Sequence, residues 1–400
     1  MDLRSGQAFW PIRSGLLANY PRLENSMTCD VVIMGAGITG ALIADKLSKE
    51  GASVIVLDKR DVARGSTSAS TALLQYEIDT HLSELIQKRG KEQAERAYWL
   101  CRDAIYKVED LCKTFKDDCG FERKPSFYYA SSKEDVSGIE LEYSVRKAAG
   151  FTLELWHEAD ISERFSFSAP AGLYSVDGAQ VDAYRLAHRL LARALEQGAQ
   201  VFDRTEVTQI SPLEKSVTLE MAGGIDINAK KLVFASGYES QTYLKEKVVK
   251  LKSSYALVTE PLVRFSGWHE RCLIWESARP YLYLRTTEEG RAIVGGEDIP
   301  FRNPKARDKL LAQKQTILEE KMSKLFPAIP FETAYSWTGT FGETKDGLAY
   351  IGESPEYPNA YFALGYGGNG ITYSVVATEI IADLFLGKTN HNAEVFRFGR

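Results

Sequence analysis

The segment DVVIMGAGITG, residues 30–40, decides the fold of this 400-residue chain. Its first five residues form a short apolar run, which is typical of a buried parallel strand. A glycine-rich turn follows at once, and residues 41–50 have the spacing of an amphipathic helix that ends at Gly51. A second apolar run, residues 53–57, ends at Asp58. The order strand, glycine turn, helix, strand and acid predicts a βαβ unit that binds a dinucleotide.

Each part of this unit has a mechanical role. Gly35 permits the tight turn, Gly37 lets a pyrophosphate approach the backbone, and Gly40 lets the helix pack closely against the strand. The helix N-terminus directs free N–H groups and the positive end of its dipole toward the phosphates. The Asp58 carboxylate can accept hydrogen bonds from ribose hydroxyls. This unit alone leaves open whether the dinucleotide is NAD or FAD.

Three later segments favour FAD. Residues 61–74 place many hydroxyls and small side chains just after Asp58, where they can donate to phosphates, although a flexible linker has a similar composition. Residues 178–210 predict a long helix at 181–197 and a strand at 200–207, and residues 231–237 add another strand of the same sheet. Residues 360–386 predict a strand, a second glycine turn and a helix, whose N-terminus suits the electron-rich edge of a reduced flavin.

Composition and charge exclude several classes of protein. The chain is 44% hydrophobic and 26% charged, which is ordinary for a globular protein and excludes a disordered or fibrous one. Its net charge of −5 gives no reason to expect nucleic acid or an anionic membrane as a partner. The length favours two or three folding units.

The cysteines and the N-terminus predict a soluble cytoplasmic protein. Five scattered cysteines without a CxxC pair favour reduced thiols over a disulfide framework or a zinc site. No signal pattern opens the chain, and no apolar run approaches the ~20 residues of a membrane span. The five histidines have no metal-ligand spacing, so we expect no metal.

These features resemble the D-amino-acid oxidase/glycine oxidase superfamily of FAD-dependent oxidoreductases, from about Cys29 to Gly387. The motifs that carry the resemblance are GAGITG (35–40), Asp58, the loop at 65–74, DGxxVD (177–182), FASG (234–237), YLR (283–285), GR (290–291), VGG (294–296), WTG (337–339), TKDG (344–347), IG (351–352) and GYGGNG (365–370). The leader FWP, residues 9–11, is similar to the amine-oxidising branch that includes gamma-glutamylputrescine oxidase.

The resemblance implies an α/β protein with a Rossmann-like FAD-binding domain of the glutathione-reductase type. An α+β substrate domain with an antiparallel sheet is inserted into it. The expected ranges are a leader at 1–28, the FAD-binding domain at 29–82, 151–240 and 335–400, and the substrate domain at 83–150 and 241–334. The residues expected to bind FAD are Gly35, Ala36, Gly37, Ile38, Thr39, Gly40, Asp58, Lys59, Arg60, Gly65, Ser66, Thr67, Ser70, Thr71, Ala72, Leu73, Val207, Ala235, Ser236, Gly237, Gly339, Gly367, Gly368, Asn369, Gly370 and Ile371.

Two departures from the family pattern bear on chemistry. The loop at 65–72 lacks the usual Arg, Asn and final Gly, and Ser70-Thr71-x-Leu73 is closer to FAD-dependent glycerol-3-phosphate dehydrogenase. Residues 338–344 contain neither the flavin-linking Cys nor the substrate-binding Arg that relatives carry near Phe341. We therefore expect non-covalent FAD and no carboxylate-binding Arg at that position.

The segment 279–285 is the best substrate-side candidate. It alternates, with Tyr283 and Arg285 on one face, and these two are the residues we predict to be catalytic. An exposed sheet face with a solvated Arg is an equally simple interpretation. Tyr255, Trp337 and Tyr366 are weaker candidates, since buried core aromatics have the same pattern.

The expected activity is oxidation of a C–N bond in an amine or amino acid. A hydride passes to flavin N5, the imine hydrolyses, and dioxygen or another acceptor takes the electrons. Two alternatives remain open: alcohol oxidation of the glycerol-3-phosphate dehydrogenase type, motivated by residues 70–73, and a flavin-binding assembly factor without turnover. The net charge disfavours a flavoprotein that modifies tRNA.

Overall fold

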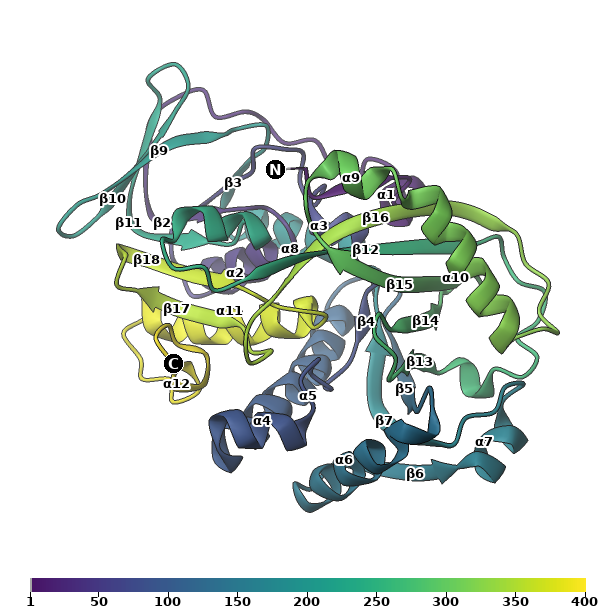
Figure 1. Cartoon of the computed structure of the whole chain (residues 1–400). Coiled ribbons are helices and arrows are strands. Elements are labelled where there is room, and N and C mark those ends of the chain that lie inside the picture. Colours follow the sequence, from purple (N-terminus) through teal and green to yellow (C-terminus); the bar gives the residue numbers. More distant parts are fainter. Residues whose placement is uncertain (1) are drawn as a thin grey trace.

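Two sheets organise the chain, one of eight strands and one of ten. The computed structural model describes residues 2–400. Figure 1 shows the eight-stranded sheet beside the ten-stranded one, with helices packed around both. This arrangement confirms the expected α/β fold with a second, mainly antiparallel sheet.

The eight-stranded sheet has a parallel centre formed by the predicted βαβ unit and its neighbours. Parallel pairing joins β18, β11, β2, β3 and β8, while β17 and the β9–β10 pair are antiparallel additions. In sheet order these strands are β17 (Tyr350–Ser354), β18 (Tyr357–Leu364), β11 (Asp226–Phe234), β2 (Met27–Met34), β3 (Val54–Leu57) and β8 (Gln200–Phe202), with β10 (Val217–Met221) on β11 and β9 (Val207–Pro212) on β10.

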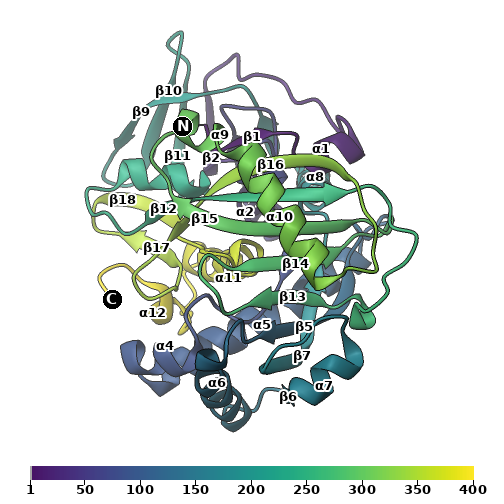
Figure 2. The same cartoon turned by 45° about the vertical axis from the view of Figure 1, so that its right-hand side comes forward.

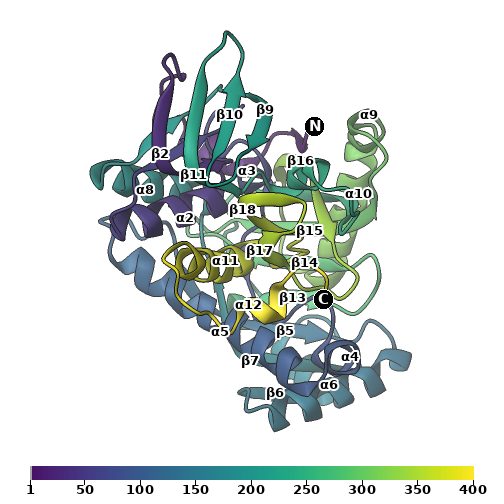
Figure 3. The same ribbon diagram turned by 90° about the vertical axis from the view of Figure 1, so that its left-hand side faces the viewer.

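Alternate residues of the central strand β2 face opposite sides of this sheet. Val31 and Ile33 pack with the helices α2 (Ile38–Lys49), α8 (Ala183–Glu196) and α11 (Gly370–Phe385). Figure 3 shows α2 between α8 and α11 on that side. Val32 and Met34 face a second cluster that includes residues of β10. Both faces are therefore covered, as a parallel sheet of continuous apolar strands requires.

The ten-stranded sheet is antiparallel except where β13 runs parallel to β5. Figure 2 shows α10 (Leu311–Leu325) crossing in front of β12, β15 and β16. In sheet order the strands are β1 (Arg4–Gly6), β16 (Thr333–Glu343), β12 (Lys250–Thr259), β15 (Ala292–Pro300), β14 (Leu282–Thr286), β13 (Leu273–Glu276), β5 (Glu122–Tyr129), β7 (Ala171–Gln180) and β4 (Leu73–Leu74), with β6 (Leu153–His157) on β7.

The sheets do not divide the chain at the expected boundaries of 151 and 335. Strands β6 and β7 lie in the ten-stranded sheet, because β7 pairs along its length with β5. Strand β16 also belongs there, because it pairs with β12 from Thr333 to Glu343. Backbone pairing between distant segments decides this membership, and it is not visible in the local pattern of either strand.

The remaining helices lie around these sheets. Gly90, whose φ is +80°, separates the two successive helices Leu82–Arg89 and Lys91–Lys113. The other helices are α1 (Phe9–Ser14), α3 (Ser66–Ala69), α4 (Leu82–Arg89), α5 (Lys91–Lys113), α6 (Val136–Ala148), α7 (Glu158–Arg164), α9 (Pro304–Asp308) and α12 (Ala393–Phe396), with 3₁₀ turns at Lys133–Asp135, Gly237–Tyr243 and His269–Arg271. Within residues 2–400, no helix combines the length and the apolar character that crossing a bilayer demands.

Candidate functional site

One cavity extends from the end of β3 to the inner side of the ten-stranded sheet. It encloses about 2220 Å³ of space, including the solvent at its mouth. Both glycine turns, at 35–40 and 365–370, contribute to its wall, as do Tyr255, Tyr283 and Trp337. Of the residues expected to bind FAD or substrate, all line the cavity except Ala36, Gly40, Ala72 and Arg285.

The first glycine turn connects β2 to α2 at close range. A Cβ on Gly40 would lie 1.8 Å from the carbonyl oxygen of Gly35, so the helix can approach the turn only without a side chain there. Gly35 itself has a φ of +115°, which disfavours other residues. The Asp58 carboxylate accepts hydrogen bonds from the N–H groups of Ala36 and Arg60, each at 2.9 Å. Burial raises the pKa of Asp58. Asp58 therefore fixes the turn to the end of β3.

The hydroxyl loop, residues 65–72, lies over the start of α2. The hydroxyl of Thr67 accepts a hydrogen bond from the Ile38 N–H at 3.0 Å. Side chains from distant parts of the chain donate hydrogen bonds to backbone carbonyl oxygens of this loop and of Arg64, just before it. The two indole N–H groups donate to the loop itself, Trp337 to Ala69 at 2.8 Å and Trp10 to Ser70 at 2.7 Å. Two guanidinium groups also donate: Arg4 to Arg64 at 2.8 Å, and Arg285 to Thr71 at 3.1 Å and Ala72 at 2.8 Å. These bonds hold the loop in one conformation beside the cavity.

Arg285 is a positioning residue rather than the substrate-side residue that we expected. Its side chain is on the same strand face as Tyr283, but the guanidinium binds the carbonyl oxygens of Thr71, Ala72 and Val181. It is 2% exposed and does not line the cavity. Burial lowers its pKa to about 9, so it stays charged at neutral pH. The alternation of side chains between the two faces of β14 was predicted correctly. The role of Arg285 was not, because the loop that it contacts is far from β14 in the sequence.

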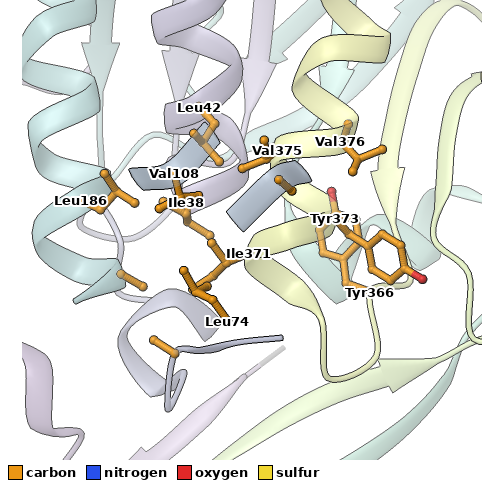
Figure 4. Packing of buried hydrophobic residues seen from close by; sticks show 14 of the residues in the cluster. Ile38, Leu42, Leu74, Val108, Leu186, Tyr366, Ile371, Tyr373, Val375 and Val376 are labelled. Atoms are coloured by element: carbon orange, nitrogen blue, oxygen red, sulfur yellow. The ribbon is translucent and has the colours of Figure 1, made fainter. Parts of the chain in front are cut away.

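The second glycine turn is joined to the first through the helices that follow them. The hydroxyls of Thr39 in α2 and Ser374 in α11 are 2.8 Å apart. Figure 4 shows Ile38 and Leu42 of α2 packed near Ile371 and Val375 of α11. The N-termini of α2 and α11 thus reach the same cavity, which is the arrangement that two separate dinucleotide-binding turns require.

Residues 75–79 run beside the second turn. The Asn369 amide donates to the carbonyl oxygens of Gln75 at 3.0 Å and Glu77 at 2.9 Å. The Gly368 N–H donates to Asp79 Oδ2 at 2.8 Å. Burial raises the pKa of Glu77 and of Asp79. Because the Asn369 side chain is used to hold this segment, the contact that we expected between Asn369 and a cofactor can come only from its remaining atoms.

An ion-pair cluster marks the end of the cavity near β3. Lys59 Nζ lies 2.9 Å from Glu239 Oε1, and an Arg60 amine lies 2.7 Å from Glu239 Oε2. Burial opposes ionisation of Glu239, but Arg60 and Lys59 outweigh it and hold its pKa at about 2. Val207 lines the cavity here, as expected. Sequence reasoning missed Glu239, which no local motif distinguishes.

The ten-stranded sheet supplies an aromatic wall. Trp275, Tyr281 and Tyr283 line the cavity from β13, β14 and the residues just before β14. The hydroxyls of Tyr283 and Ser254 are 3.2 Å apart. Burial raises the pKa of Tyr283, so its hydroxyl keeps its proton.

Polar residues on this side were also missed, although a signal was present. Gln75, Glu77 and Asp79 all line the cavity, and the residues between them, Tyr76 and Ile78, are buried. This alternation has the period of an extended chain, and it follows directly on a loop that was assigned to the cofactor. The pattern could have identified one polar face at 75–79.

The cavity fits FAD. It joins two helix N-termini, a cradle without side chains at Gly35–Gly40, and an aromatic wall. Several buried polar atoms of lining residues have no hydrogen-bond partner within residues 2–400, among them Ser66 Oγ, Glu77 Oε2, Trp275 Nε1 and Tyr366 Oη. None of the described lining residues is Cys or His, the residue types that most often link flavin covalently. The residues present are thus compatible with a dinucleotide held by non-covalent contacts.

Comparison with known proteins agrees with this geometry. The sequence profile of a family described as FAD dependent oxidoreductase matches residues 30–384. Glycine oxidase of Geobacillus kaustophilus is 26% identical over 367 residues, covering 89% of this chain and 92% of that protein. Gamma-glutamylputrescine oxidoreductase of Escherichia coli strain K12 is 24% identical over 393 residues, covering 95% and 89%. The profile covers most of the chain, including both glycine turns.

Solved structures share the fold. The crystal structure of glycine oxidase from Geobacillus kaustophilus superposes with a TM-score of 0.77 at 22% identity, covering 91% of this chain and 96% of that one. L-amino acid deaminase from Proteus vulgaris superposes with a TM-score of 0.77 at 15% identity, covering 96% and 99%. At such identities, the likeness establishes the fold alone.

Proposed function

Since this chain belongs to the FAD dependent oxidoreductase family, we propose that it oxidises a C–N bond of a small amine or amino acid. Two relatives support this choice of substrate, because their names are glycine oxidase and gamma-glutamylputrescine oxidoreductase. The observation that carries the proposal is the single cavity in which two helix N-termini meet an aromatic wall.

The cofactor side of the cavity is the eight-stranded sheet with its two glycine turns. Asp58 and the turn at 35–40 hold the adenosine and the pyrophosphate, and the turn at 365–370 lies at the flavin. The N–H groups of both helix N-termini favour the negative charge at these two places. FAD is bound without a covalent link, in agreement with the absence of Cys and His from the described lining.

The substrate side is the ten-stranded sheet. When bound, FAD supplies the acceptor for the hydride that leaves the substrate carbon. Tyr283, Trp275 and Tyr281 orient the substrate, and the buried sheet behind them excludes water. Tyr283 is the residue that we propose to touch the substrate at the reacting end. The five cysteines are unpaired, which supports a cytoplasmic location.

Anaerobic reduction of the bound flavin tests this function. The purified protein is expected to be yellow, and acid is expected to release its FAD. A panel of N-methyl amino acids, D-amino acids, polyamine conjugates and glycerol 3-phosphate is then added without oxygen, with dithionite as the positive control. Bleaching by an amine or amino acid supports the proposal. Bleaching by glycerol 3-phosphate alone, or by dithionite alone, contradicts it.

A further inference from the structure

The aromatic wall of the cavity is acidic rather than basic. Glu77 and Asp79 line it together with Trp275, Tyr281 and Tyr283. Among the described lining residues the only cations are Lys59 and Arg60, which bind Glu239 at the opposite end. No described Arg or Lys therefore lines the wall where a substrate carboxylate could bind.

Glu77 is a buried carboxyl group that the protein pairs only in part. It is 5% exposed, and its Oε2 has no hydrogen-bond partner among the described residues. Its Oε1 lies 3.5 Å from Arg146, but Arg146 also binds Glu142 at 2.7 Å. Two buried carboxylates thus share one guanidinium. Burial raises the pKa of Glu77, and a cation that enters the cavity would favour the ionised form of this carboxyl group, because an unpaired buried carboxylate is costly.

Asp79 likewise lacks a cation of its own. Its one hydrogen bond is from the Gly368 N–H. Two cations act on it from outside the lining: Lys252, which is bound to Glu343 at 2.7 Å, and Arg279, which lies 4.7 Å over the Tyr281 ring. Asp298, another carboxyl group near Asp79, adds to the acidity of this region. The faces of aromatic rings attract cations as well.

From this combination we propose that the substrate is a cationic amine that carries no carboxylate on the carbon bonded to the reacting nitrogen. Glu77 and Asp79 bind the positive charge of the substrate, and the rings of the aromatic wall enclose its carbon chain. Where that charge is on the reacting nitrogen, the nitrogen gives its proton to one of these two carboxylates before the hydride leaves the neighbouring carbon. We expect an α-amino acid to bind more weakly, because its carboxylate would face these two acids and no described Arg or Lys lines the cavity beside them. This inference rests on the proposed C–N oxidation and narrows its substrate class.

Matched pairs of compounds test the inference on the FAD-loaded enzyme. Benzylamine is compared with both enantiomers of phenylglycine, and putrescine with both enantiomers of ornithine, by anaerobic flavin reduction. Each acid differs from its amine by one carboxylate at a carbon next to nitrogen. We expect the amines to reduce the flavin with at least about tenfold higher efficiency. If the acids are equal or better, the inference is wrong while the C–N oxidation stands. If neither class reduces a flavin that dithionite reduces, both are wrong.

The variant Asp79→Asn tests the role of the carboxylate. An Asn oxygen can still accept the Gly368 N–H, so the turn is retained. We expect the dissociation constant of benzylamine to rise about tenfold, while that of benzyl alcohol, a neutral competitor followed by the flavin spectrum, stays within twofold. The control is Asp203→Asn, a buried carboxylate that does not line the cavity. Equal weakening of both ligands would show a structural role and overturn the inference.

Discussion

Replacement of Trp10 by Phe should weaken FAD binding, although Trp10 does not line the cavity. Its Nε1 donates to the carbonyl oxygen of Ser70 at 2.7 Å, and Trp10 is 1% exposed. Phenylalanine keeps an aromatic ring under the Arg285 guanidinium, which lies 5.3 Å from the Trp10 ring. The variant thus removes mainly one buried donor to the hydroxyl loop.

The expected loss of FAD binding free energy follows from the Ser70 carbonyl group, which loses its hydrogen-bond donor. An unsatisfied buried carbonyl costs about 1–3 kcal/mol. If the Ser70 carbonyl turns toward solvent to recover a partner, the backbone beside the cavity turns with it. A loss of about 1.4 kcal/mol raises the FAD dissociation constant about tenfold.

Titration of the apoprotein with FAD measures this constant through flavin fluorescence, and urea denaturation measures the free energy of unfolding. The control is Trp268→Phe. Trp268 is also buried, and its Nε1 donates to the Cys272 carbonyl at 2.8 Å, but it does not line the cavity or contact the loop. Both variants should lose stability, and only Trp10→Phe should lose FAD affinity. An unchanged FAD constant in Trp10→Phe, or equal losses in the two, would refute the reasoning.

Three further predictions concern other parts of the chain. Gly40→Ala should abolish FAD binding, because the new Cβ would lie 1.8 Å from the Gly35 carbonyl oxygen. The control is Gly138→Ala in α6, where a new Cβ meets no atom within 4 Å, and this variant should raise the free energy of unfolding by up to about 1 kcal/mol. Arg285→Lys should lower the melting temperature and FAD affinity, since the shorter lysine side chain draws its ammonium back from the carbonyls of Thr71, Ala72 and Val181 and has no counterpart of the Nε that donates to the Thr286 carbonyl. The KM for substrate in the FAD-saturated enzyme should stay unchanged, and a raised KM would restore Arg285 as a substrate residue. Burial raises the pKa of Asp298 from 3.8 to about 7, so the folded protein loses stability as pH rises between these values. Urea denaturation measures the free energy of unfolding of Asp298→Asn and of the parent at pH 4 and pH 8. The difference between variant and parent should shift in favour of the variant by up to about 4 kcal/mol from pH 4 to pH 8. Parallel pH profiles of the two proteins would contradict this.

Local sequence was sufficient for the βαβ unit and for the helices α8 and α11. The helix expected at 181–197 is α8 (Ala183–Glu196), and the one expected from 371 to 386 is α11 (Gly370–Phe385). These segments are predictable because each carries its own periodic apolar face and its own glycine at the turn. The expectation that both glycine turns reach one cavity also agrees with the structure.

Long-range contacts account for the features in which the structure differs from the sequence predictions. Arg285 lies on the predicted face of β14, but its partners at 71, 72 and 181 belong to segments more than 100 residues away. Glu239 could not be found because it becomes a site residue only through Lys59 and Arg60. The boundaries at 151 and 335 differ because strand pairing assigns β7 and β16 to the second sheet.

By itself, the sequence determined the glycine turn at residues 35–40 and predicted its role in dinucleotide binding, since that turn depends on neighbours within one βαβ unit. Only the tertiary structure decided which residues face the cavity from the other sheet, and which hold the hydroxyl loop from behind. The physical reason is that hydrogen bonds and buried charges are set by distances between segments that the chain order does not encode. The acidity of the aromatic wall is such a property, because it depends on which of the described Arg and Lys side chains line the cavity beside Glu77 and Asp79 and which stay outside it.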